Sequence, residues 1–146
     1  TVVDNRTYLA TADEQNQVQG ILAIDADTGK QVWIKELSKG GFPKTHPKNT
    51  HASGTVVCDG ERLFTTFHHH NKLTLHAVDL EGNILWSEDV GPFNPQRYEY
   101  GYAGSPVLYK DTVIVAADVD QGGYLTASAR QAGKPLCTHD RLPAYS

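Results

Sequence analysis

Short apolar runs alternate with polar, glycine-containing segments along the whole chain, and the clearest example lies between residues 21 and 34. Ile21–Ile24 and Gln31–Ile34 have the length and composition of two strands, and the segment DTGK stands between them. Gly29 of that segment accommodates the positive φ that a short bulged turn requires. Asp25 closes the first strand, where its carboxylate is expected to accept free N–H groups of the turn. The pattern predicts a β-hairpin with Trp33 near its far end.

The same hairpin pattern returns later in the chain. The segment AIDADTGKQVW at residues 23–33 matches HAVDLEGNILW at residues 76–86, with a displacement of 54 residues at the alanines and 53 at the tryptophans. A pattern repeated at a nearly constant spacing is the sequence signature of a repeat architecture. The positions shared by the two copies are Ala23, Asp25, Gly29, Trp33, Ala77, Asp79, Gly82 and Trp86.

A third, weaker copy follows at residues 126–137 with the sequence TASARQAGKPLC. Ala129 and Cys137 occupy the positions of the aspartate and the tryptophan, while the turn glycine is retained. The segments that precede the hairpins match as well, because Gly54–Val57 aligns with Gly104–Val107 at a displacement of 50 residues. Loss of a tryptophan from a core typically costs about 3–5 kcal/mol, so the third repeat is expected to be held less tightly.

Each repeat accommodates four short strands and requires no helix. Repeats of this length with four antiparallel strands and glycine-rich turns are typical of propeller blades, whose strands are apolar at adjacent positions because both faces are covered. A two-sheet sandwich also has short strands, but it does not predict a regularly repeated hairpin. The expected fold class is all-β, a β-propeller fragment of about three four-stranded antiparallel blades at residues 1–37, 54–90 and 104–141. Three blades cannot close a ring, so we expect the remaining blades of the same chain to lie outside this segment.

The motif A-x-D-x-x-T-G-K-x-x-W of the first copy resembles the tryptophan-docking repeat of the PQQ-type β-propellers of bacteria. That family includes pyrroloquinoline-quinone dehydrogenases and a lipoprotein that assists assembly of outer-membrane proteins. The resemblance implies that Trp33 and Trp86 pack on the backbone of neighbouring blades, and that the shared alanines, aspartates and glycines are architectural. It also implies an extracytoplasmic location, in the periplasm or cell envelope.

Composition and charge exclude several classes of function. The chain has 146 residues and a net charge of −4, and its 13 Lys and Arg residues are scattered, whereas nucleic-acid binding needs a concentrated basic face. No apolar run is long enough to span a membrane. Cys58 and Cys137 lie 79 residues apart and form no metal-binding or redox motif.

The candidate binding residues lie on the unrepeated connectors between blades. Turns between the second and third strands emerge at the same end of each blade as the two connectors, Ser38–Asn49 and Gly91–Tyr102, because successive turns alternate ends. We call this end the connector face. The candidate binding residues on it are His46, His51, His68, His69, His70, Arg97, Tyr98, Tyr100 and Tyr102.

Two interpretations of these side chains stay open at this point. The triple histidine His68–His70 is interpreted mainly as a polar hairpin tip, and a metal site with His46 or His51 is the alternative. Successive strand residues point to opposite faces, so at most two of the three can serve one ion, and we assign no metal ligand. The tyrosines either line a recognition surface or cover the mouth of the propeller. His76, which aligns with Leu22, is expected to pack at a blade interface with a hydrogen bond.

The sequence favours a binding role over catalysis. It contains no nucleophile elbow and no phosphate-binding glycine loop. We expect a non-catalytic scaffold or binding module that mediates interactions with a protein or an extracellular polymer and needs no cofactor. The alternative is part of a PQQ-dependent quinoprotein dehydrogenase, which would bind PQQ with Ca²⁺. Neither the metal site nor the catalytic carboxylate of such an enzyme can be assigned to residues of this chain.

Overall fold

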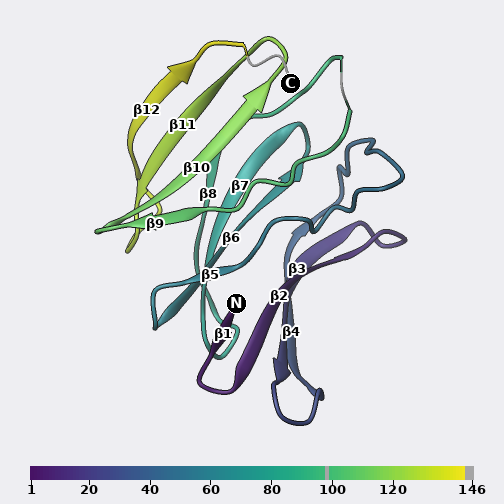
Figure 1. Cartoon of the computed structure of the whole chain (residues 1–146), viewed down its shortest axis with the longest axis vertical. Coiled ribbons are helices and arrows are strands. Elements are labelled where there is room, and N and C mark those ends of the chain that lie inside the picture. The colour runs from purple at the N-terminus through teal and green to yellow at the C-terminus, as the bar shows by residue number, and fades with distance from the viewer. Residues whose placement is uncertain (98, 144–146) are drawn as a thin grey trace.

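The computed structural model describes residues 1–97 and 99–143 and contains three four-stranded antiparallel sheets that lie side by side in chain order (Figure 1). We call them blades 1, 2 and 3. Blade 1 comprises β1 (Val2–Val3), β2 (Arg6–Asp13), β3 (Val18–Asp25) and β4 (Gln31–Lys39). Blade 2 comprises β5 (Val57–Cys58), β6 (Arg62–His69), β7 (Lys72–Asp79) and β8 (Ile84–Pro92). Blade 3 comprises β9 (Val107–Tyr109), β10 (Thr112–Val119), β11 (Gly122–Ala129) and β12 (Pro135–Arg141).

Each blade is a simple meander in which every strand pairs with the next one along the chain. Tight turns make this possible: Asp4–Asn5 and His70–Asn71 both place two successive residues at positive φ, as a two-residue hairpin turn of the primed type requires. The described residues contain no helix. The predicted all-β fold class and the four-stranded antiparallel blades are therefore confirmed.

Two apolar clusters hold the blades together, one at each blade interface. The first joins residues of blade 1, such as Ile21, to Leu63 and Val78 of blade 2. The second joins Leu75 and other residues of blade 2 to Val113 and its neighbours in blade 3. Blade 2 is covered on both faces, which explains why six consecutive residues are buried in each of its two central strands.

Each tryptophan docks on the turn of the following blade. Trp33 donates from Nε1 to the carbonyl oxygen of Leu80 at 3.1 Å, and its ring covers Gly82. Trp86 repeats this arrangement one blade later, where it donates to Arg130 at 3.3 Å and covers Gly133. The implied docking of the tryptophans on the backbone of neighbouring blades is confirmed. Each tryptophan docks on the blade that follows it in the chain.

This direction removes the reason given for expecting a loosely held third repeat. The interface between blades 2 and 3 is made by Trp86, which is present, while Cys137 is exposed on the outermost strand β12. The substitution at position 137 therefore removes no contact between these two blades, and it gives no reason for blade 3 to be loosely held. Gly29 differs from the later turn glycines, because a Cβ built there would meet nothing within 4 Å.

Two arginines contribute to docking in a way that the sequence did not indicate. Arg6 donates from its guanidinium to the Leu80 carbonyl that Trp33 also uses, at 3.3 Å. Arg62 donates in the same way to the Arg130 carbonyl, also at 3.3 Å. Both arginines begin the second strand of their blades, so each interface has a tryptophan and an arginine on one carbonyl.

The repeated aspartates organise the docking turns. Asp25 accepts hydrogen bonds from the backbone N–H and the hydroxyl of Thr28, at 2.8 and 2.6 Å. Asp79 accepts from the backbone N–H of Glu81 and from Asn83, which takes the role of the threonine in the second repeat. The expected interaction of Asp25 with turn N–H groups is confirmed, and both carboxylates are engaged by their own turns.

The His76 side chain joins blades 1 and 2 by hydrogen bonds inside the interface, as expected. It is 2% exposed, and its ring nitrogens lie 3.0 Å from Ser38 Oγ of blade 1 and 2.8 Å from Ser87 Oγ of blade 2. Burial lowers the pKa of His76 from 6.5 to about 4. Ser38 belongs to β4, so the first connector begins later than the sequence predicted.

Acidification is therefore expected to destabilise the protein between pH 6.5 and pH 4. Above pH 6.5 His76 is neutral in both states, whereas below it the unfolded chain binds a proton that the folded chain takes up only near pH 4. This interval corresponds to a loss of about 3 kcal/mol from His76. Urea unfolding at a series of pH values measures it.

The matched variant is His76→Leu, because leucine occupies the aligned position 22 in blade 1. Its unfolding free energy at pH 7 falls, since Ser38 and Ser87 lose their partner, but its dependence on pH between 6.5 and 4 becomes shallower. An unchanged pH dependence in the variant would show that another group is responsible.

Candidate binding site on the connector face

Two connectors, residues 40–56 and 93–106, cross the same end of the blades and hold each other (Figure 1). Thr45 Oγ1 and Asn49 Nδ2 both donate to the carbonyl oxygen of Tyr100, at 3.0 and 2.5 Å. An exposed ion pair joins Lys44 to Glu99 at 3.1 Å. The connectors of different blades thus form one surface, which is stabilised by contacts between segments about 55 residues apart in the sequence.

His51 is a support inside the first connector. Its Nδ1 lies 2.7 Å from a carboxylate oxygen of Glu14, its Nε2 lies 2.9 Å from the carbonyl oxygen of Pro43, and its ring stacks on Phe42 at 4.2 Å. Both polar partners are acceptors, so both bonds form when each ring nitrogen carries a hydrogen. Gln19 of β3 donates to the His51 carbonyl at 2.6 Å and ties the connector to blade 1. The side chain of His51 is thus occupied by structural contacts.

The triple histidine is divided between a strand and a turn, which corrects the interpretation of all three as a polar hairpin tip. His68 is the last buried residue of β6 and is 4% exposed. His69 is half-buried, and its Nε2 forms a hydrogen bond of 3.0 Å with Thr74 Oγ1. His70 alone lies in the exposed turn, with its ring against Gly41 of the first connector. The strand continues two residues further than the polarity of the sequence suggested.

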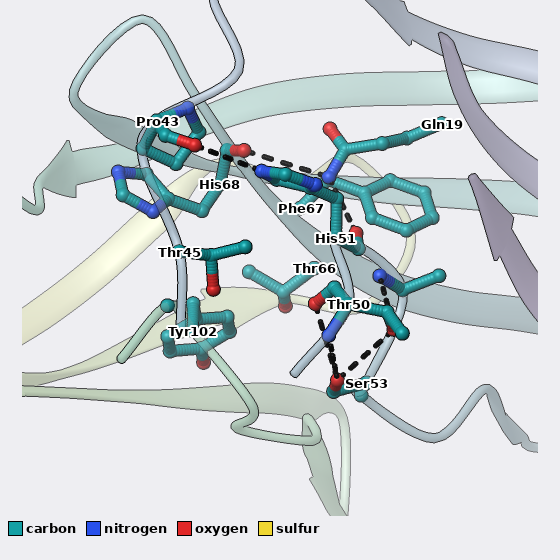
Figure 2. A pocket seen from close by; sticks show the side chains of 13 residues that line it. Gln19, Pro43, Thr45, Thr50, His51, Ser53, Thr66, Phe67, His68 and Tyr102 are labelled. Atoms are coloured by element: carbon teal, nitrogen blue, oxygen red, sulfur yellow. Dashed lines mark hydrogen bonds between the residues drawn. The ribbon is translucent and has the colours of Figure 1, made fainter. Parts of the chain in front are cut away.

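His68 lies beside a narrow polar pocket beneath the connectors. Figure 2 shows its backbone carbonyl facing the Gln19 amide, while its ring lies on the other side beside Pro43. The pocket has a volume of about 10 Å³, which is room for one water molecule. Burial lowers the pKa of His68 from 6.5 to about 4. Interaction of the ring with the Phe93 backbone raises the pKa, but by less than burial lowers it.

The aromatic segment of the second connector has mixed roles. Tyr102 donates from its hydroxyl to the Ala116 carbonyl at 3.0 Å and packs edge-on against Phe93, so it covers blade 3, and its burial raises the pKa of the phenol. Tyr100 is 56% exposed and contacts the His46 ring at 5.6 Å. Arg97 donates from its backbone N–H to Asp120 at 3.0 Å. Tyr98 lies outside the described residues.

Comparison with known proteins agrees with this architecture. A family profile described as outer membrane protein assembly factor BamB, of the PQQ-like type, matches residues 1–140. The chain belongs to this family. No curated protein sequence matches it.

A solved structure shares the fold of this BamB-type segment. The crystal structure of the quinohemoprotein alcohol dehydrogenase from Comamonas testosteroni superposes with a TM-score of 0.61 and 21% sequence identity. The match covers 96% of this chain and 20% of that one, so this chain spans a fifth of the length of its relative. A likeness at this level of identity establishes the propeller fold of the three blades and no activity.

Within residues 1–97 and 99–143, no group of three or more His, Cys, Asp or Glu side chains is placed to hold a metal ion. The described part of the chain also has no helix that is long and apolar enough to cross a membrane.

Sequence reasoning missed several residues that build the connector face. Gln19 and Thr66 are polar residues in strands that also contain apolar residues, and a polar position beside apolar ones is the one signal that could have identified them. Phe93 is 5% exposed and packs against both His68 and Tyr102. Asp120 fixes the second connector by accepting from two backbone N–H groups.

Proposed function

We propose that the chain is a non-catalytic propeller segment that presents its connector face to a partner, a protein or an extracellular polymer, outside the cytoplasm. The observation that carries the proposal is the clasp between the two connectors, which fixes exposed side chains in one surface at one end of the blades. Exposed groups on this surface include Tyr100, Lys44 and His46. Tyrosine is one of the residue types that contribute most to protein interfaces.

The opposite end of the blades has a different role, which is to join neighbouring blades. There the turns after β3, β7 and β11 form, and the later two receive Trp33 and Trp86 of the preceding blades. Those turns are engaged in holding the blades together, whereas the connector face presents exposed side chains on segments that do not take part in docking. An extracytoplasmic location is supported by membership in the BamB-type family.

Site-specific photo-crosslinking in the full-length protein, in the cells that make it, tests the proposal. A photoreactive amino acid is placed at Tyr100 or Lys44 on the connector face, and at Glu61 or Asp111 at the other end as matched exposed controls. We expect a discrete cross-linked partner from the connector positions and none from the controls. Equal labelling from both ends would contradict a role for the connector face.

The dehydrogenase alternative is tested on the same full-length protein. Titration with pyrroloquinoline quinone and Ca²⁺, followed by quinone absorbance and by alcohol oxidation, is expected to show neither saturable binding nor turnover. Saturable binding accompanied by turnover would replace the scaffold proposal with the enzyme.

A further inference from the structure

His68 stands between two cavities of the connector face. The narrow pocket on one side holds about one water molecule and is lined by Gln19 and Thr66, among others. A second cavity of about 90 Å³ lies on the other side, where Lys44, Asn71, Asn94 and Glu99 are exposed around it. Pro43 and Gly101 of the two connectors line both cavities. His68 is thus a buried polar floor that both cavities share.

The polar atoms at this floor have no partner within the described structure. Both ring nitrogens of His68, Oε1 of Gln19 and Oγ1 of Thr66 are buried without a hydrogen bond of good geometry to a described residue, although the Phe93 backbone lies close enough to the His68 ring to act on its pKa. These three residues are each 4% exposed or less. A buried polar group without a partner costs about 1–3 kcal/mol. The His68 ring nitrogens lie on the wall that both cavities share, so they indicate that something polar occupies the space beside the ring.

The charge of the site restricts what that occupant is. Burial keeps His68 neutral at ordinary pH, so its ring offers one donor and one acceptor. The carboxamides of Asn71 and Asn94 offer the same combination at the mouth of the larger cavity. Among the described residues, the charged groups that line this cavity are Lys44 and Glu99, and they neutralise each other in an ion pair. The complementary ligand is uncharged and carries both a donor and an acceptor.

Size narrows the ligand further. A cavity of about 90 Å³ has room for several water molecules, and therefore for a planar amide but not for a large ring system. Phe93 packs edge-on against the His68 ring at 4.8 Å and fixes its orientation.

We propose that His68 is the floor of a recognition site for a neutral primary amide, the side-chain carboxamide of an asparagine or glutamine presented by a protein partner. The inference rests on the proposed binding function of the connector face and assigns its chemistry. The carboxamide enters the larger cavity between Asn71 and Asn94 and exchanges hydrogen bonds with the imidazole. The two connectors, held by their clasp, form its walls.

Binding of small blocked amino acids to the 146-residue chain, followed by the NMR signals of its backbone amides and histidine rings, tests the site. N-acetyl-asparagine-N-methylamide is the probe, and the equivalent aspartate and leucine derivatives are the matched comparisons. We expect saturable, millimolar-range changes centred on residues 68, 71 and 94 with the asparagine probe. Binding of the other two is expected to be about tenfold weaker, the effect of one or two lost hydrogen bonds.

Two variants locate the effect. His68→Phe keeps an aromatic ring but cannot form hydrogen bonds with the amide. Asn94→Ala changes an exposed side chain and is expected to leave the fold intact, so it tests the site even if His68→Phe does not fold. Each is expected to weaken binding of the asparagine probe, by about tenfold and several-fold respectively. Gln131→Ala, an exposed carboxamide in the turn after β11, is the unaffected control.

The outcomes separate the two proposals. Equal binding of the leucine probe, or unchanged binding of the asparagine probe in the folded variants, overturns the amide site without touching the crosslinking result. Amide binding together with equal crosslinking from both ends of the blades supports the site and overturns the proposed function of the whole face.

Discussion

Replacing Trp86 by alanine is expected to lower the free energy of unfolding by about 3–5 kcal/mol. The indole packs against Phe64 with ring centroids 5.9 Å apart, covers Gly133 of blade 3 and donates to the Arg130 carbonyl. Alanine leaves a cavity at the interface of blades 2 and 3 and removes a hydrogen bond that crosses it. Urea unfolding followed by circular dichroism measures the loss.

Trp86→Phe is the matched control for this prediction. Phenylalanine keeps much of the apolar contact and loses the donor, so about 1 kcal/mol of the effect is expected from the hydrogen bond, with some further loss from the smaller ring. If Trp86→Ala remained within 1 kcal/mol of the original protein, docking of Trp86 would not be what joins blades 2 and 3.

Replacing Gly133 by alanine is expected to destabilise the protein by about 3 kcal/mol. Gly133 has a φ of +72°, which an L-residue adopts at a cost of about 1–2 kcal/mol. A Cβ at this position would also lie 2.5 Å from Cε3 of Trp86, so the indole would have to move out of its packed position, at a cost of about 1–3 kcal/mol. The same unfolding experiment measures the change.

Gly29 provides a control with the same backbone and a different neighbourhood. Its φ is +70°, but a Cβ would meet nothing within 4 Å, so Gly29→Ala should show the backbone cost alone. In the double variant Trp86→Ala with Gly133→Ala, the added methyl group no longer meets the indole ring. The loss of unfolding free energy in the double variant should therefore be smaller than the sum of the losses in the two single variants. Equal costs at positions 29 and 133 would contradict a steric role for Trp86.

The two ends of the blades have separate tasks in this chain. At one end the repeated turns receive a tryptophan and an arginine from the preceding blade. At the other end the unrepeated connectors clasp each other above His68. Because stability and the proposed recognition depend on different ends, variants such as Asn94→Ala are expected to change binding without changing stability.

The sequence predicted the strands, the blade repeats and the docking motif because these features are encoded locally. Strand composition, a turn glycine and a tryptophan at a fixed spacing recur at residues 23–33 and 76–86, and local contacts such as Asp25 with Thr28 depend on neighbours in the chain. The same reasoning failed at His68, which it placed in a polar turn. Neighbouring strands and connectors bury that residue, and histidine polarity alone does not report their presence.

By itself, therefore, the sequence determined that this protein is built of four-stranded blades joined through tryptophans. Only the tertiary structure decided the direction of docking, the role of Arg6 and Arg62, and the burial of His68. The physical reason is distance along the chain. Arg6 meets Leu80 across 74 residues and Gln19 meets the His51 backbone across 32, and such contacts arise from the stacking of blades rather than from any pattern within one repeat.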